Sequence, residues 1–407
     1  MPSLINERNL PTNWAIKKFK YCAQICNGGE YSDIEVEEGG YPVIGSGGEF
    51  ARASKFSYYG KSVLLGRKGT VDKPLFVDGA FWCVDTMFYT KIKDFMYEKY
   101  LYYCALCFPF DYYATSTALP SMTQRDLGSQ EIAVPPRKEQ KVIADFLDKE
   151  CAQIDSIAAD LEKQIELLQQ YKKSLITETV TKGLDKSVPM KDSGVEWLGK
   201  IPAHWNVKRF KDECSKIGDI DHYMPDSADE GIPYIMTGDF IGDENNIDFV
   251  NCKRISREDY IRLSKKMKPM YGDILLARYA TIGTVRIVDI HEEFLVSYAC
   301  AIIRIKESSY SKYIYYYLKS DTYFEEISQY IKTNTQANVG IDSIGRAKVP
   351  VPPIEEQEEI SEFLDKKCHE INLVLRDKQK QLLTIQQHKN SLIYEYVTGK
   401  KRVKEVQ

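Results

Sequence analysis

The side chains best suited to binding chemistry lie in two short segments, "LLGRKGT" at 64–70 and "LLARYAT" at 275–281. An arginine fork donates two parallel hydrogen bonds to a phosphate or to the edge of a guanine. Lysines beside such turns favour phosphate contacts, which give affinity rather than sequence choice. The candidates for contact with nucleic acid are Arg67, Lys68, Thr70 and Lys73 around the first segment, and Lys265, Lys266, Lys268, Arg278, Tyr279 and Thr281 around the second.

A second pair of segments, "TSTALPSMTQ" at 115–124 and "TNTQANVGID" at 333–342, is rich in small hydroxyl and amide side chains. Such side chains hydrogen-bond the edges of bases, and they equally cap a loop by bonding its own backbone. The sequence leaves both interpretations open. The candidates here are Thr117, Ser121, Thr335, Gln336 and Asn338.

The formal net charge of −4 argues mildly against a nucleic-acid partner, because domains that bind nucleic acids are usually basic. The charge is unevenly spread, however. Residues 251–286 contain nine Lys and Arg against three Asp and Glu, and residues 51–73 contain six against one. A single basic cluster is most often only a solvated face. Two clusters at equivalent places of a repeated chain favour a surface for an anionic ligand.

The chain contains an internal repeat. The segment 134–183 aligns with 351–400 without a gap, and "LPTNWAIKKFK" at 10–20 matches "IPAHWNVKRFK" at 201–211. The two candidate turns fall at the same place of this repeat. The offset between matched landmarks grows from 191 to 211, so the second copy carries about 20 additional residues before its turn.

Short strands, glycine turns and one tyrosine-rich helix in each copy predict two mixed α/β domains, and hence an α+β chain. The expected organisation is a first globular domain at 1–133, a central helix at 134–183, a linker at 184–200, a second globular domain at 201–350, a C-terminal helix at 351–400 and a tail at 401–407.

Each Pro-Pro pair, at 135–136 and 352–353, precedes apolar residues that alternate by four and three, which is typical of a coiled-coil seam. Gly183 and Gly399 stand where helix C-caps belong. Each helix could pack only on its own domain, but two copies of one stripe favour pairing of the helices with each other, in antiparallel fashion. The expected seam is Leu147, Ile154, Leu161, Ile165, Leu168 and Leu175 in the first helix, and Leu364, Ile371, Leu375, Leu382, Ile385 and Leu392 in the second.

The "VPP…EQ…I…FLD" helices, the segment "KDSGVEWLGKIPAHW" at 191–205 and the turn "LLGRKG" resemble the DNA specificity subunit of type I restriction–modification systems. The resemblance covers nearly the whole chain; only the "KDSGxEWxG" part has no counterpart before Leu10. It implies two target recognition domains that each read one half of a split site in double-stranded DNA. It also implies helices that dock two methyltransferase subunits, with restriction subunits joining through them. Two alternatives are a coiled-coil scaffold that reads no DNA and the specificity subunit of a methyltransferase-only system.

No catalytic motif is visible in the sequence. "YYGKS" at 58–62 resembles the end of a phosphate-binding loop, but Lys55 stands where its first glycine must be. Cys104 and Cys107 lack the second Cys pair that a zinc site needs, and the five His have no ligand spacing. We therefore expect a non-catalytic chain without cofactor or metal. No run of eighteen apolar residues predicts a membrane span, and we expect a cytoplasmic location.

The tyrosine-rich helices expected at 100–113 and 313–324 admit two interpretations. Tyrosines can stack on bases, or they can pack in a core with the hydroxyl at the surface. The second interpretation is favoured.

Overall fold

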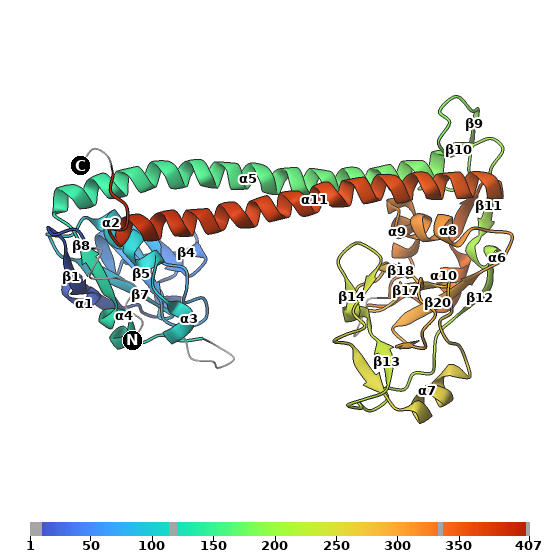
Figure 1. Cartoon of the computed structure of the whole chain (residues 1–407), viewed down its shortest axis with the longest axis horizontal. Coiled ribbons are helices and arrows are strands. Elements are labelled where there is room, and N and C mark those ends of the chain that lie inside the picture. Colours follow the sequence, from blue (N-terminus) through green and yellow to red (C-terminus); the bar gives the residue numbers. More distant parts are fainter. Residues whose placement is uncertain (1–9, 114–119, 333–336, 404–407) are drawn as a thin grey trace. The chain divides into compact units, whose positions relative to one another are not determined.

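The computed structural model describes residues 10–113, 120–332 and 337–403. The chain divides into two compact units: unit 1 comprises Met1–Glu162 and Gln379–Gln407, and unit 2 comprises Lys163–Lys378. Each unit therefore holds one globular domain together with a part of both long helices (Figure 1). Among the described residues, none of the helices is both long and apolar enough to cross a lipid bilayer.

Unit 1 is built on a six-stranded sheet with the strand order β2-β7-β5-β6-β3-β4, antiparallel except for the parallel pair of β3 and β6. Val63 and Leu65 of the central strand belong to one buried cluster and Leu64 to another, so this strand is covered on both faces. The strands are β2 (Ala23–Asn27), β3 (Tyr41–Gly45), β4 (Gly48–Ala53), β5 (Tyr58–Gly66), β6 (Leu75–Cys83) and β7 (Met87–Ile92).

A short antiparallel pair, β1 (Ala15–Lys18) with β8 (Glu131–Val134), joins the beginning and the end of the first domain. The Thr123 hydroxyl accepts a hydrogen bond from the amide of Asp126, whose carboxylate bonds back to the Thr123 amide; this capping box starts α4. The helical segments of the domain are α1 (Phe19–Cys22), a 3-10 turn at Ser32–Ile34, α2 (Glu98–Leu106), α3 (Phe110–Tyr113) and α4 (Gln124–Ser129).

Unit 2 repeats this frame. Its strand pair β11–β21 corresponds to β1–β8, and the order β12-β20-β17-β18 corresponds to β2-β7-β5-β6. The order β19-β13-β16 corresponds to β6-β3-β4, with the same parallel and antiparallel pairings, so β18 and β19 together take the place of β6. A second sheet, β16-β13-β19, and a hairpin, β14–β15, complete the domain.

The elements of unit 2 outside the long helices have the following bounds. The strands are β9 (Met190–Asp192), β10 (Lys200–Pro202), β11 (Asn206–Arg209), β12 (Cys214–Gly218), β13 (Ile232–Ile235), β14 (Phe240–Ile241), β15 (Asn246–Ile247), β16 (Lys253–Ile255), β17 (Ile274–Ala277), β18 (Val285–Ile287), β19 (Leu295–Val296), β20 (Cys300–Ile305) and β21 (Lys348–Val351). The helices are α6 (Phe210–Glu213), α7 (Arg257–Ser264), α8 (Ser311–Leu318), α9 (Asp321–Ser328) and α10 (Ile341–Arg346), and a 3-10 turn lies at Thr237–Asp239.

The two long helices are α5 (Arg137–Lys182) and α11 (Ile354–Val397). In unit 1 the ring centroids of Phe146 and Tyr396 are 4.6 Å apart, and the Lys389 ammonium bonds the Asp155 carboxylate at 2.6 Å. Residue numbers rise along one helix as they fall along the other, so the helices are antiparallel. The predicted α+β class, with two mixed domains, two long antiparallel helices and an internal repeat, is confirmed.

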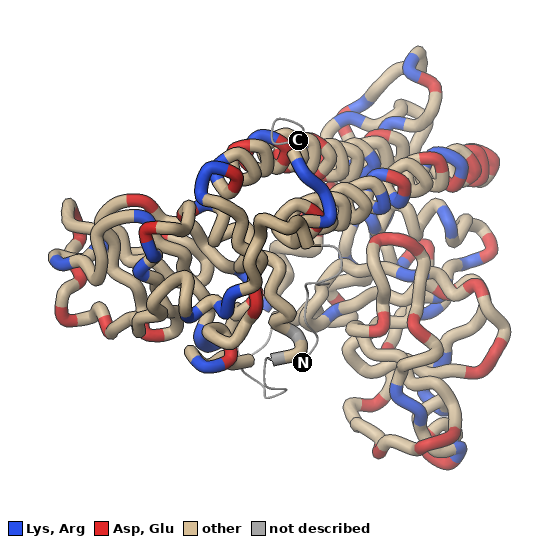
Figure 2. Tube along the Cα trace, turned by 60° about the vertical axis from the view of Figure 1, so that its left-hand side comes forward, with Lys and Arg blue, Asp and Glu red and all other residues tan. Residues whose placement is uncertain are grey.

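Along both long helices, every residue of the predicted seam is buried or half-buried, while most of the intervening residues are exposed. This is the burial pattern of one apolar stripe packed against a partner helix. Acidic and basic positions are interspersed along both helices (Figure 2). The helices are therefore held together by their apolar stripes and solvated on their remaining surface.

A tryptophan joins each domain to the end of a long helix. Trp205 is buried, and a Cβ placed on Gly183, which caps α5 with φ of 72°, would lie 3.2 Å from its ring. Trp14 is buried in the same way beside Gly399, which has φ of 76°. Only glycine combines this left-handed backbone with so close an approach to an indole ring. Each of the two glycines thus ends a long helix and also leaves space for the tryptophan that packs there.

The tyrosine-rich helices also bind the long helices, and here the expectation that their hydroxyls lie at the surface is wrong. The Tyr100 hydroxyl is buried within hydrogen-bond distance of the carbonyl oxygens of Ala133 and Val397. The Tyr313 hydroxyl lies in the same way between the carbonyl oxygens of Pro350 and Val180. The end of a long helix leaves carbonyl groups unpaired, so a buried phenol finds its partner there.

Candidate nucleic-acid interface

The two candidate segments of unit 1 lie side by side. The amide of Met122 donates to the carbonyl oxygen of Arg67 at 3.0 Å. An isolated β-bridge next to this bond pairs Lys68 with Ser121. The turn after β5 and the loop before α4 are therefore one structural feature, although more than fifty residues separate them in the chain.

Unit 2 builds the same feature from different residues. The amide of Val339 donates to the carbonyl oxygen of Arg278 at 3.0 Å, and an isolated β-bridge pairs Tyr279 with Asn338. We call each arrangement a turn–loop pair: residues 66–70 with 120–122 in unit 1, and residues 277–281 with 337–339 in unit 2. Backbone bonds that are the same in both units hold side chains that differ between them.

In unit 1 the turn presents its charges to solvent. Arg67 is half-buried; its guanidinium donates to the carbonyl oxygen of Asp85 at 3.2 Å and lies 5.8 Å from the Phe88 ring centroid. These contacts orient the guanidinium but provide no carboxylate for it. The neighbouring candidates Lys68, Thr70 and Lys73 are exposed.

The tips of the two turns differ at one backbone position. Gly69 has φ of 77°, and Ala280, which stands at the same place of the repeat, has φ of 54°. Ala280 is the single non-glycine residue with positive φ in the described part of the chain. A left-handed conformation costs an L-residue about 1–2 kcal/mol, so the turn of unit 2 is held in its shape by the surrounding bonds.

Arg278 differs from its counterpart in unit 1, and the structure corrects its expected role. Its side chain is 5% exposed, and its guanidinium bonds the carboxylate of Asp219 together with the carbonyl oxygens of Tyr298 and Val339. Because the N–H groups of its guanidinium bond acceptors inside the domain, this arginine supports the turn rather than facing a ligand. A sequence comparison of the two turns treats the arginines as equal, whereas their partners make them different.

The carboxylate that holds Arg278 also contacts a lysine and a histidine. Lys266 bonds Asp219 at 2.7 Å, and His222 lies 3.3 Å from it. Burial alone would raise the pKa of Asp219, but the hydrogen bond from Lys266 and the charges of Arg278 and Lys266 outweigh it and lower the pKa. Lys266 is therefore engaged within the domain, although it is expected from the sequence to contact phosphate.

The exposed part of the second turn is formed by neighbours of Arg278. Tyr279 is half-buried, with its ring under the Arg278 guanidinium at 4.8 Å and edge-on to Tyr298 at 6.2 Å. Thr281 is exposed, and Asn338 is half-buried beside the turn. Tyr279 occupies the place that Lys68 has in unit 1, so an aromatic ring replaces a charge at the tip.

Much of the basic cluster at 251–286 is also engaged inside unit 2. Arg257 pairs with Glu293, and Arg262 pairs with Asp259. Arg286 is 1% exposed and bonds only backbone carbonyl oxygens among its hydrogen-bond partners. Lys265, Lys266 and Lys268 are exposed, and Lys266 is the one of these three that pairs with Asp219. The sequence thus overstates the charge that this cluster offers to a ligand.

Three sequence candidates, Thr117, Thr335 and Gln336, lie outside the described residues. Conversely, sequence reasoning missed Asp219 and His222, whose contacts decide the state of Arg278. The only signal is the run "DIDHY" at 219–223, which follows β12 and places acidic and imidazole groups at the end of a strand. Asp219 and Arg278 are 59 positions apart, so their pairing cannot be read from spacing.

The described residues offer no cluster of groups suited to bind a metal ion. Within residues 10–113, 120–332 and 337–403, no cluster of three or more His, Cys, Asp or Glu side chains is arranged to hold a metal ion. Burial raises the pKa of the Cys107 thiol to about 12, and it also raises the pKa of Cys104. A protonated, buried thiol is a packing group rather than a nucleophile.

Comparison with known proteins places these features in a family context. The family model for "Type I restriction modification DNA specificity domain" matches residues 11–167 and 202–383. Each match covers one domain with the first part of the long helix that follows it. The duplication seen in the structure is therefore a duplication of this domain.

Curated relatives with similar sequences are specificity subunits. The chain is 26% identical over 298 residues to the type I restriction enzyme MjaVIII specificity subunit of Methanocaldococcus jannaschii, covering 71% of this chain and 66% of that protein. It is 25% identical over 307 residues to the EcoBI specificity subunit of Escherichia coli, covering 70% of this chain and 64% of that protein. The matched regions thus span slightly less than two thirds of these relatives' own length.

A solved structure shares the fold. It was determined in a study of complex assembly and conformational transition of a type I restriction–modification system. The TM-score is 0.68, with 14% sequence identity and coverage of 96% of this chain and 99% of the other.

Proposed function

The chain belongs to the type I restriction–modification DNA specificity family, and from that premise we propose that it selects the DNA sequence for a type I restriction–modification complex. In this proposal the domains at 1–133 and 201–350 are target recognition domains, and each reads one half of an interrupted DNA site. The chain catalyses no reaction, needs no cofactor and acts in the cytoplasm, where partner subunits methylate or cleave the DNA that it selects.

The observation that carries the proposal is the turn–loop pair, present once in each unit. The same backbone bonds hold Arg67 and Lys68 in one unit and Arg278 and Tyr279 in the other. A conserved frame with different side chains is what two readers of different sequences require. Identical readers would select a palindrome, whereas unlike readers select two unrelated half-sites.

The two turns differ in the chemistry that they offer to DNA. Arg67 and Lys68 give unit 1 a charged tip, which suits a guanine edge together with the phosphates beside it. Tyr279 and Asn338 give unit 2 an aromatic and amide tip, which suits an adenine edge or a thymine methyl group. The exposed Lys265 and Lys268 would contact phosphates near the second half-site.

The long helices also offer matched surfaces for partner subunits. Ile157 on α5 is 49% exposed, and Val374, at the same place of the repeat on α11, is 45% exposed. Exposed apolar side chains at equivalent positions favour two near-equivalent contacts. We therefore propose that one chain docks two methyltransferase subunits through its helices, and that restriction subunits join through these.

Two measurements test this assignment. Selection from random DNA with the co-purified complex should enrich two unrelated short motifs separated by a fixed gap. Native mass spectrometry should show two methyltransferase subunits for each chain. Ile157→Asp and Val374→Asp should each remove one of them, with Gln164→Asp as an exposed control on the same helix. A selection that enriches no motif would overturn the assignment.

A further inference from the structure

One polar layer interrupts the apolar seam in unit 1. Lys389 of α11 bonds both oxygens of the Asp155 carboxylate of α5, at 2.6 and 2.7 Å. An ammonium and a carboxylate thus face each other across the helix pair. The charge of this layer is balanced by the helices alone.

The equivalent layer of unit 2 lacks its carboxylate. Lys172 corresponds to Lys389 in the repeat, but Asn372 stands in the place of Asp155. The Lys172 side chain is only 6% exposed, and the amide oxygen of Asn372 accepts its hydrogen bond at 2.8 Å. A neutral partner leaves a buried ammonium without a counter-charge, which is costly.

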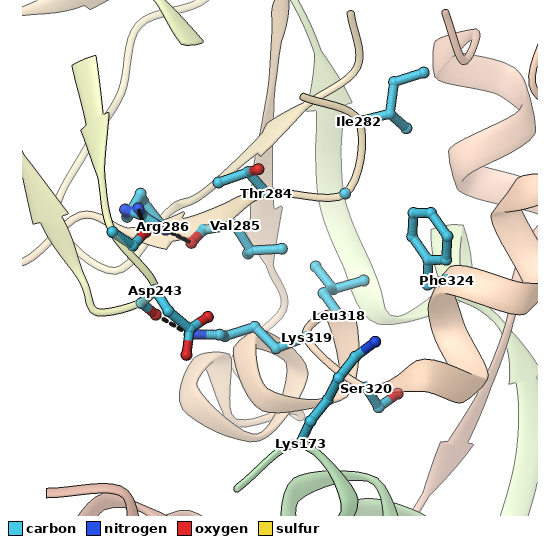
Figure 3. A pocket seen from close by; sticks show the side chains of 12 residues that line it. Lys173, Asp243, Ile282, Thr284, Val285, Arg286, Leu318, Lys319, Ser320 and Phe324 are labelled. Atoms are coloured by element: carbon cyan, nitrogen blue, oxygen red, sulfur yellow. Dashed lines mark hydrogen bonds and ion pairs between the residues drawn. The ribbon is translucent and has the colours of Figure 1, made fainter. Parts of the chain in front are cut away.

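The counter-charge comes from the globular domain. Asp243 lies at the tip of the β14–β15 hairpin, and its carboxylate accepts a hydrogen bond from Lys172 at 2.7 Å. Lys319 donates to the backbone carbonyl oxygen of Asp243 and also lies near its carboxylate (Figure 3). Although desolvation opposes it, the charges of Lys319 and Lys172 lower the pKa of Asp243, so the carboxylate is ionised at neutral pH.

The hairpin is built to hold this position. The buried Arg286 guanidinium donates to the carbonyl oxygens of Ile241, Gly242 and Asn246, and thereby fixes both strands at the tip. Beside Asp243, Glu244 pairs with Arg376 of α11 at 2.6 Å. The tip therefore contacts one long helix through Asp243 and the other through Glu244.

The hairpin also lies within the additional residues of the second copy. The offset between the copies grows between 239 and 275, and the hairpin spans Phe240–Ile247. The first domain has no equivalent segment at this place of the repeat. The missing carboxylate on the helix and the added carboxylate on the hairpin therefore occur in the same half of the chain.

We propose that the hairpin tip, residues 242–245, is a brace that fixes the orientation of the second domain on the helix pair, with Asp243 as its positioning residue. Asp243 supplies from the globular domain the carboxylate that the helices lack at this layer, so the Lys172 ammonium gains this partner only when the hairpin is docked. The equivalent layer of unit 1 needs no such brace, because Asp155 already supplies its carboxylate.

Two variants distinguish loss of the brace from a general loss of stability. Asp243→Asn leaves Lys172 without a carboxylate, so the melting temperature should fall by about 2–4 °C. Backbone amides of 240–247 should then exchange with deuterium roughly tenfold faster or more. Asn372→Asp combined with Asp243→Asn recreates the layer of unit 1; it should restore the melting temperature while exchange at 240–247 stays fast.

Asp155→Asn is the matched control, because it removes the carboxylate of the equivalent layer in unit 1. It should lower the melting temperature without changing exchange at 240–247. If Asp243→Asn does not fold, Arg376→Gln, which breaks only the exposed pair with Glu244, should still accelerate exchange at the tip. Two results would contradict the brace. The first is unchanged deuterium exchange at 240–247 in a folded variant that lacks Asp243 or Arg376. The second is a double variant whose melting temperature is as low as that of Asp243→Asn.

The consequence for DNA rests on the proposed function. A looser second domain should tolerate half-sites moved by one base pair, so the double variant should discriminate several-fold less between adjacent gap lengths than the parent chain does. If deuterium exchange at 240–247 is faster in the double variant but its discrimination between gap lengths is unchanged, the hairpin does not fix the orientation of the second domain. Failure of the parent chain to select any DNA motif would count against the proposed function instead, and the exchange experiment would still test the brace.

Discussion

Arg67 and Arg278 occupy the same place of an internal repeat, yet only Arg278 is paired with a carboxylate, that of Asp219. Arg67 is half-buried and contacts a carbonyl oxygen and a phenylalanine ring. The repeat preserved the residue and its backbone bonds while the surroundings diverged. The same side chain is therefore a candidate DNA contact in one domain and a structural support of its own turn in the other.

Substitution of the two arginines should lower the unfolding free energy by unequal amounts. Arg278→Ala removes a buried ion pair and the donors to the carbonyl oxygens of Tyr298 and Val339, while Lys266 still bonds Asp219, so unit 2 should lose about 1–3 kcal/mol of unfolding free energy. Arg67→Ala removes no ion pair and should cost no more than about 0.5 kcal/mol. Thermal unfolding of both variants checks this; equal losses would show that burial and pairing do not distinguish the two positions.

Ala280→Gly should stabilise unit 2. Alanine with φ of 54° is strained, whereas glycine adopts this conformation freely, at the expense of more entropy in the unfolded chain. We expect a net gain of roughly 0.5–1 kcal/mol in unfolding free energy. The reverse substitution at the matched position, Gly69→Ala, should destabilise unit 1. A loss of stability in Ala280→Gly would contradict the strain.

Unit 2 should lose stability in acid through Asp219. Its pKa is lowered in the folded protein because the hydrogen bond from Lys266 and the nearby cations outweigh desolvation. The stabilisation is therefore complete above the ordinary Asp pKa of about 4 and is lost as the pH falls through the lower folded-state value. Asp219→Asn should flatten this part of the stability profile. If the stability of that variant falls in acid as it does in the parent chain, other carboxylates account for the loss.

A heptad inserted beside Leu161 and another beside Leu382 should lengthen the gap between the half-sites. The antiparallel register places these residues at the same level, and seven residues preserve the seam. The added length is about 10 Å, or roughly three base pairs of duplex. Selection among sites with graded gaps checks this. Undiminished preference for the original gap would show that the helices do not set the spacing.

The sequence alone predicts the repeat, the seam and the two segments that form each turn–loop pair. These depend on periodicity and on matched landmarks, which are local or repeated signals. The state of Arg278 and the brace at Asp243 depend on single pairings between distant residues, Asp219 with Arg278 and Lys172 with Asp243. One trace of the brace is visible in the sequence, since Asn372 replaces Asp155 in an otherwise similar helix, but nothing there identifies the replacement carboxylate.

Selection from random DNA with paired variants tests the central claim, that two unlike turn–loop pairs read two separate half-sites. Arg67→Ala should relax one motif, with a loss of about 1–3 kcal/mol there if the guanidinium binds a guanine, and should leave the other motif intact. Tyr279→Ala should relax the other motif alone. Two unlike readers are contradicted if both variants alter the same motif, or if both motifs survive both substitutions unchanged.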